Sequence, residues 1–192
     1  VGDWANIPDT ESAREGWAHH GMAISEGGDI ITFHQGDGTV LVLDREGNLK
    51  QSWSSGLTEG HGMTLVKEKD DEYLWIADNG AKRIPKSSYD YGEGPRAGRV
   101  VKMAMGGQIL MELEKPDLPI YRQGEYSPTW VAINEERHGG NGDIWVTDGY
   151  GQSHVHRYDK NGRYIASING EEGTAGTFSC PHAIFMDIRK TE

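Results

Sequence analysis

Three histidines stand at the start of short apolar stretches that share one sequence pattern. The pattern occurs four times, as His20-Gly-Met-Ala-Ile-Ser25, His61-Gly-Met-Thr-Leu-Val66, Thr129-Trp-Val-Ala-Ile-Asn134 and His182-Ala-Ile-Phe-Met-Asp187. If these stretches are strands around one axis, imidazoles from separate strands converge and can bind a divalent metal ion, with one position open for water. The alternative is that each histidine caps a strand end and bonds to a neighbouring carbonyl group.

Tyr150 is the candidate general base. It follows Asp148 and Gly149 at the end of a predicted strand. A nearby cation favours the phenolate form of tyrosine, and a phenolate can remove a proton from a substrate. The alternative is a tyrosine that packs on a loop and takes no part in chemistry.

Two further histidines could add metal ligands, but structural roles are favoured for both. His20 has the same register in its copy of the pattern as His61. His34 occupies the place that Asp78 and Asp148 hold in later copies.

The remaining side chains with ligand chemistry are also predicted to be structural. His154 and His156 alternate along one strand and so share a face, where an exposed pair is favoured over a metal site. His138 lies in a Gly-rich hairpin and is expected to be solvated. Cys180 is expected to be a buried small hydrophobe rather than a soft metal ligand.

The elements that would position these residues are strands. After each of the first three copies come a polar turn, a second strand, a loop, a third strand and another turn. Self-similarity over about 40–50 residues with several strands per unit is typical of β-propeller blades. The predicted strands that follow the repeated stretches are residues 29–33, 39–43, 49–53, 73–77, 99–103, 108–113, 143–147, 154–158 and 163–168.

We therefore predict an all-β fold, a β-propeller, with one domain over residues 1–192 and about three and a half blades. The blades begin near His20, His61, Thr129 and His182, and the last has only one strand. Propellers close with about four to eight blades, and an open row leaves unpaired sheet edges. Three arrangements remain: a longer protein, which is favoured, two copies that close one ring, or a smaller closed ring. The expected partner is thus a set of remaining blades from a longer chain or a second copy.

Composition limits the other partners. The 192 residues include 27 glycines, and a hydrophobic content of 35% suits short strands joined by tight turns. A net charge of −11 argues against nucleic acid and anionic membranes as partners. No stretch approaches the roughly 18 apolar residues of a membrane span. The single cysteine excludes an intrachain disulfide.

Four stretches carry a family resemblance: Tyr126-Ser-Pro-Thr-Trp-Val-Ala-Ile133, Gly142-Asp-Ile-Trp-Val-Thr-Asp-Gly-Tyr150, Val155-His-Arg-Tyr-Asp-Lys-Asn-Gly-Arg163 and Phe178-Ser-Cys-Pro-His-Ala-Ile184. They resemble NHL repeats and, more narrowly, the peptidyl-α-hydroxyglycine α-amidating lyases. Thr32-Phe-His-Gln-Gly-Asp37 and His61-Gly-Met63 continue the match, which covers most of the chain from about Gly21 onward.

The resemblance implies a six-bladed propeller with a catalytic zinc ion held by three histidines. His61 and His182 match two of these ligands, and the third would lie beyond Glu192. Tyr150 matches the family's tyrosine base. The substrate hydroxyl in that family belongs to a carbinolamide, which collapses to an amide and glyoxylate.

The resemblance also implies a structural calcium ion, and it has departures. The calcium would take the backbone carbonyls of Met22 and Met63. Gln35 replaces an arginine that contacts substrate in the family, so a fixed charge and a bidentate donor are lost. Gly151 stands where the family has a disulfide-bonded cysteine.

Two functions of different classes follow from these observations. The leading hypothesis is a metal-dependent lyase-like or hydrolase-like enzyme that acts on a hydroxyl of a small-molecule or peptide substrate, with Tyr150 as base. The competing hypothesis is a non-enzymatic NHL propeller that binds a protein or a glycan. The combination of His61, Tyr150 and His182 favours the enzyme, and Gln35 favours its rival.

Overall fold

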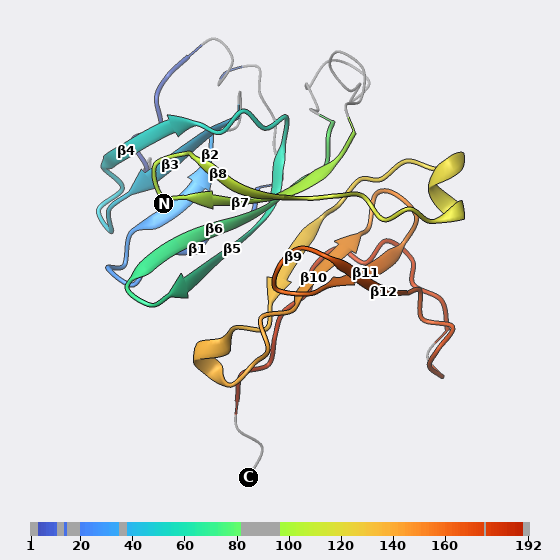
Figure 1. Cartoon of the computed structure of the whole chain (residues 1–192). Coiled ribbons are helices and arrows are strands. Elements are labelled where there is room, and N and C mark those ends of the chain that lie inside the picture. The colour runs from blue at the N-terminus through green and yellow to red at the C-terminus, as the bar shows by residue number, and fades with distance from the viewer. Residues whose placement is uncertain are drawn as a thin grey trace.

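The chain folds into successive antiparallel sheets. The computed structural model describes residues 4–10, 14, 20–34, 38–81, 97–174 and 176–189, so Gln35 lies outside the described residues. The described part contains three four-stranded sheets and two short 3-10 helices, η1 (Pro119–Arg122) and η2 (Glu136–His138). Neither helix is long and apolar enough to cross a membrane. Figure 1 shows the sheets following one another from the blue to the red part of the chain.

Each sheet is a meander in which strands pair in chain order. The first blade contains β1 (Ala23–Ile24), β2 (Ile30–Phe33), β3 (Thr39–Leu43) and β4 (Leu49–Ser54). The second contains β5 (Gly60–Glu68), β6 (Asp71–Asp78), β7 (Arg99–Ala104) and β8 (Ile109–Leu113). The third contains β9 (Trp130–Ile133), β10 (Ile144–Asp148), β11 (His154–Tyr158) and β12 (Tyr164–Ile168). This is the all-β blade architecture that the sequence predicts.

The hydrophobic core lies between blades. Successive side chains of a strand point to opposite faces of its sheet. In β6, Leu74 and Ile76 pack against the first blade, whereas Trp75 and Ala77 pack toward the third. The second blade is therefore covered on both faces, which explains why β6 reads as a continuous apolar run rather than an alternating one.

The first strands of the three blades lie side by side, as the repeated pattern predicts. β1 contacts β5, and β5 contacts β9. The backbone N–H of Gly21 donates to the His61 carbonyl at 2.6 Å. A Cβ atom at Gly62 would lie 2.4 Å from the Thr129 carbonyl oxygen, so only glycine allows β5 to approach the next blade this closely. The glycine after His61 thus has a packing role.

Two repeated stretches differ from regular strands. β1 has only two residues, although the pattern extends over residues 20–25. The described residues 176–189 contain no strand, although the pattern predicts one from His182. A strand is defined by its hydrogen-bonded partner, and no described segment forms a ladder with this part of the chain.

Candidate active site

Three of the predicted site residues meet at the ends of neighbouring segments. The Tyr150 hydroxyl lies 3.1 Å from His61 Nε2 and 2.7 Å from His182 Nε2. The centroids of the two imidazole rings are 4.7 Å apart. These residues are 89 and 32 positions from Tyr150 in sequence, so the fold, not local geometry, brings them together.

His61 is held in one orientation. Its Nδ1 lies 2.9 Å from the Thr129 carbonyl oxygen, which can only accept a hydrogen bond. Nδ1 therefore carries the proton, and the lone pair of Nε2 faces Tyr150. A histidine that donates its other ring N–H to a carbonyl is the arrangement typical of metal ligands.

The number of protons available fixes the direction of both hydrogen bonds to Tyr150. Tyr150 has one hydroxyl proton, which it donates to His61 Nε2. His182 Nε2 must therefore donate to the Tyr150 oxygen. His61 is 2% exposed, while Tyr150 is 41% exposed and His182 is exposed. The cluster thus has a buried side fixed by protein and an open side that a substrate could reach.

A buried carboxylate fixes the turn that carries Tyr150. Asp148 has no exposed surface, and it accepts hydrogen bonds from the Ser127 N–H at 2.7 Å and the Gln152 N–H at 2.7 Å. The Tyr150 N–H in turn donates to the Ser127 carbonyl at 3.3 Å. A Cβ at Gly149 would lie 2.4 Å from the Pro181 carbonyl oxygen, so this glycine lets the segment before His182 approach the turn.

In the second blade, too, an aspartate side chain accepts hydrogen bonds from backbone N–H groups. Asp78 accepts hydrogen bonds from the Thr58 and Glu59 N–H groups, each at 2.9 Å, and so fixes the segment that leads into β5 and His61. In the first blade His34 holds this register, and its Nε2 lies 3.1 Å from the Pro8 carbonyl. The structural role that the sequence favours for His34 fits this contact.

A chain of hydrogen bonds through Tyr121, His156 and Ser167 leads to Asp148. The sequence alone did not predict it. The Tyr121 hydroxyl lies 2.6 Å from Asp148 Oδ2 and 2.6 Å from His156 Nε2, and His156 Nδ1 lies 2.7 Å from Ser167 Oγ. Burial and the Asp148 carboxylate raise the pKa of Tyr121, so its hydroxyl donates to Asp148. His156 Nε2 must then donate to the Tyr121 oxygen, and Ser167 donates to Nδ1.

His156 is therefore buried and neutral, and the expectation of an exposed pair with His154 is wrong for it. Burial lowers the pKa of His156 to about 3 from an ordinary 6.5. The face that His154 and His156 share turns toward η1, whose Tyr121 covers His156. The equivalence of Asp148 with Asp78 was the one sequence signal that could have indicated this buried polar centre.

We predict that this histidine makes the fold acid-sensitive. The unfolded chain binds a proton at position 156 below pH 6.5, whereas the folded site accepts it only near pH 3. Unfolded protein thus binds more protons between these values, and the free energy of unfolding should fall as pH falls, by about 1.4 kcal/mol per pH unit from this group. Urea unfolding of the parent and of His156→Gln at pH 7 and pH 4.5 measures it. The variant should lose less stability, and an equal loss in both would contradict the assignment.

The remaining candidate ligands lie apart from the His61 cluster. His20 has its ring nitrogens 3.2 Å from the Gly60 carbonyl and 3.3 Å from the His34 carbonyl, which fits the structural role favoured for it. His138 is exposed and lies beside Glu135. Cys180 is exposed, so the expectation of a buried residue is wrong, and its backbone has a positive φ of 53°.

The residues expected to bind zinc and calcium differ in how well their positions suit a metal ion. Two imidazole nitrogens that face one oxygen suit two ligands of a zinc ion. Among the described residues no group of three His, Cys, Asp or Glu side chains could hold a metal ion, so a third ligand would come from elsewhere. Met63 is buried and Met22 is 67% exposed, on the neighbouring segments joined by the Gly21–His61 hydrogen bond.

Comparison with curated proteins gives a relative of similar sequence. No model of a known protein family matches the chain. The chain is 25% identical over 193 aligned residues to a probable peptidyl-alpha-hydroxyglycine alpha-amidating lyase, pgal-1, of Caenorhabditis elegans, in a match that covers 86% of this chain and 49% of the relative. The chain thus spans about half the length of that protein.

Two solved lyase structures have low similarity to the chain. A virginiamycin B lyase from Staphylococcus aureus superposes with a TM-score of 0.39 at 15% identity, over 79% of this chain and 55% of that chain. A streptogramin B lyase superposes with a TM-score of 0.40 at 14% identity, over 79% and 54% of the two chains. In sequence, the chain resembles a peptidyl-α-hydroxyglycine α-amidating lyase, and its sheets follow one another as the blades of a β-propeller do.

Proposed function

We propose that the protein is a metal-dependent lyase that acts on the hydroxyl group of a peptidyl-α-hydroxyglycine. The observation that carries the proposal is the convergence of His61 Nε2 and His182 Nε2 on the hydroxyl of Tyr150. His61 and His182 would hold zinc, which would polarise the substrate hydroxyl. Sequence similarity to an amidating lyase supports the same substrate class.

In this proposal Tyr150 transfers the proton. A cation held by His61 and His182 would favour the phenolate of Tyr150, and this phenolate oxygen would accept the proton of the carbinolamide hydroxyl. The C–N bond then breaks, the hydroxyl carbon becomes the aldehyde of glyoxylate, and the amide nitrogen takes up the proton that Tyr150 had accepted. Tyr150 is suited to this role because its backbone is fixed through Ser127 and Asp148, while its side chain is partly exposed. A positioned acid–base group of this kind contributes about 10²–10⁴-fold to a rate.

Further polypeptide would complete this site. Met22, Ile24, Phe185 and Ile188 are each more than half exposed, in the repeated stretches where β1 begins the first blade and where the described chain ends. We propose that additional blades of a six-bladed ring, from a longer chain or a second copy, cover them. Those blades would also supply a third zinc ligand and complete a calcium site at the carbonyls of Met22 and Met63.

A non-enzymatic binding propeller is the second candidate. The observation in its favour is Gln35, which replaces an arginine expected to contact substrate. A glutamine cannot supply the fixed charge that would pair with the carboxylate of a hydroxyglycine. In this alternative the propeller binds a protein or a glycan.

Elemental analysis of the full-length protein, together with turnover, separates these candidates. Zinc should be present in the parent and lost from the His61→Ala, His182→Ala double variant, and the parent should release glyoxylate from a peptidyl-α-hydroxyglycine. Equal metal content in parent and variant would remove the site from these residues. Metal loss without turnover by the parent would keep the site and reject the substrate.

A further inference from the structure

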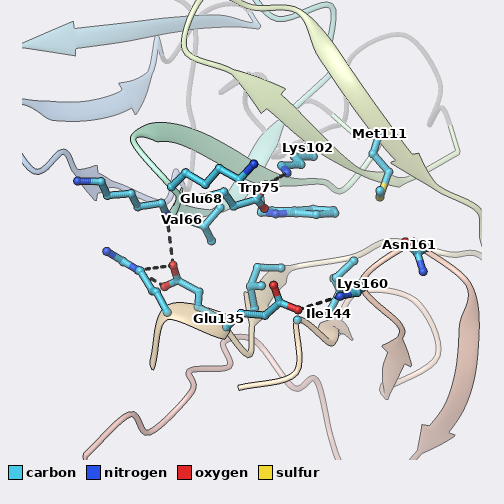
Figure 2. A pocket seen from close by; sticks show the side chains of 15 residues that line it. Val66, Glu68, Trp75, Lys102, Met111, Glu135, Ile144, Lys160 and Asn161 are labelled. Atoms are coloured by element: carbon cyan, nitrogen blue, oxygen red, sulfur yellow. Dashed lines mark hydrogen bonds and ion pairs between the residues drawn. The ribbon is translucent and has the colours of Figure 1, made fainter. Parts of the chain in front are cut away.

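A cavity lies between the second and third blades, at the end opposite the histidines. β5 carries His61 near its start, and Val66, Lys67 and Glu68 at its end line the cavity. At about 3.3 Å per residue, these positions are about 17–23 Å along the strand from His61. Figure 2 shows the cavity with the two sheets above and below it. The cavity is therefore separate from the candidate active site.

The walls of the cavity are apolar. Val66, Trp75 and Ile144 are each 3% exposed or less, and Met111 and Ile133 lie beside them. The cavity has a volume of about 340 Å³, within the range of small-molecule sites. An aromatic ring can stack on an indole and contact a thioether favourably. Trp75 and Met111 therefore suit a flat apolar group.

The rim of the cavity is basic, in contrast to the chain as a whole. Five basic side chains and three acidic ones line it, a local charge of +2 in a chain of −11. Each of the three carboxylates has a basic partner on the same rim: Lys102 with Glu68 at 2.6 Å, Arg137 with Glu135 at 2.7 Å, and Lys160 with Glu136 at 2.9 Å. The carboxylates are thus neutralised locally and repel an incoming anion only weakly.

Lys67 and Lys69 account for the charge of +2 among the lining residues, but only Lys69 is left without an acidic partner among the described residues. Lys67 pairs with Glu26, which lies outside the cavity lining and is largely exposed. Lys69 is exposed at the turn after β5 and has no ion-pair partner among the described residues. The buried indole N–H of Trp75 also lacks an acceptor in the part of the chain that the structure describes. The Lys69 ammonium and the Trp75 indole N–H both lack an oxygen partner among the described residues, and a ligand oxygen is a group of this kind.

We propose that this cavity binds a small organic carboxylate with an apolar, aromatic body. The body lies against Trp75, Val66 and Ile144, and the carboxylate faces the rim at Lys69. A neutral apolar molecule would fill the walls but leave the surplus charge unmatched, and a purely ionic molecule would leave the walls wet.

Phenylacetate and its neutral isostere phenylacetamide provide the test. Phenylacetate should shift the Trp75 indole N–H resonance saturably, with a Kd in the millimolar range or tighter, and phenylacetamide should bind about 10-fold more weakly. The resonance is identified by its loss in Trp75→Phe. Saturation-transfer spectra of the ligand give a second measurement that needs no such variant.

Matched lysine variants locate the carboxylate. Lys69→Gln should weaken phenylacetate binding by about 2–5-fold, the factor expected for one partly exposed charge pair. Lys50→Gln removes a lysine of the first blade that pairs with Asp29 away from the cavity, and it should leave binding unchanged. Absence of saturable binding, equal binding of the amide, or an equal effect of both lysine variants would overturn the proposal.

Discussion

Replacing Tyr150 by phenylalanine is expected to lower kcat for a peptidyl-α-hydroxyglycine by about 10²–10⁴-fold, because the variant lacks the oxygen that would accept the substrate proton. The change deletes one oxygen atom and preserves the ring that packs edge-on against both imidazoles, at centroid distances of 5.1 Å and 5.2 Å. His61 should keep its orientation, because its Nδ1 bonds to the Thr129 carbonyl and not to Tyr150.

Steady-state release of glyoxylate by the full-length protein measures this effect, and zinc content is determined on the same samples. Tyr73→Phe is a matched control, since Tyr73 lies in β6 and its ring contacts Lys102 away from the site. The control should retain activity. A Tyr150→Phe protein with unchanged kcat and unchanged zinc would rule out Tyr150 as the base.

The largest expected effect on stability comes from Asp148→Ala. This change removes the acceptor of three donors, the Ser127 and Gln152 N–H groups and the Tyr121 hydroxyl. A buried donor without an acceptor costs about 1–3 kcal/mol, and breaking a buried network is among the few single changes that exceed about 4 kcal/mol. We expect the free energy of unfolding to fall by about 3–5 kcal/mol.

Asp159→Ala is the control for this measurement. Asp159 accepts the Asn161 and Arg163 N–H groups in an exposed hairpin turn, where water can replace it. Its loss should lower the free energy of unfolding by about 1 kcal/mol or less. Urea unfolding at pH 7 compares the two variants. Equal losses would mean that Asp148 acts as an ordinary turn residue and not as a buried support.

The blade architecture was predictable because its signals are local. Residues 154–158 are predicted and observed as one strand, β11, and 143–147 differs from β10 by one residue at each end. Alternation within strands and Asp-to-Gly turns between them depend on neighbours in sequence. β1 was not predictable at its observed length, because strand length depends on how many partners a segment finds across space.

The site was predictable only in part, because it too depends on contacts between segments far apart in sequence. The common register of His61 and His182 indicated that their imidazoles would share one end of their strands, and the structure places both beside Tyr150. Tyr121 belongs to a connection with no counterpart in the other blades, so no repeat could reveal it. His156 alternates as a surface residue would, and only the covering Tyr121 makes it buried.

The hydrogen bond from His61 to the Thr129 carbonyl has a consequence for how the protein folds. Within each blade the strands pair in chain order, so hairpins can form early through loops that are short except for residues 79–98 between β6 and β7. His61 and Thr129 are 68 residues apart, and Thr64 Oγ1 bonds to the Val131 carbonyl across the same blade boundary. The tautomer of His61 is therefore set only after two blades have docked. Exchange of its ring proton with solvent should report separation of the blades, not unfolding of either one.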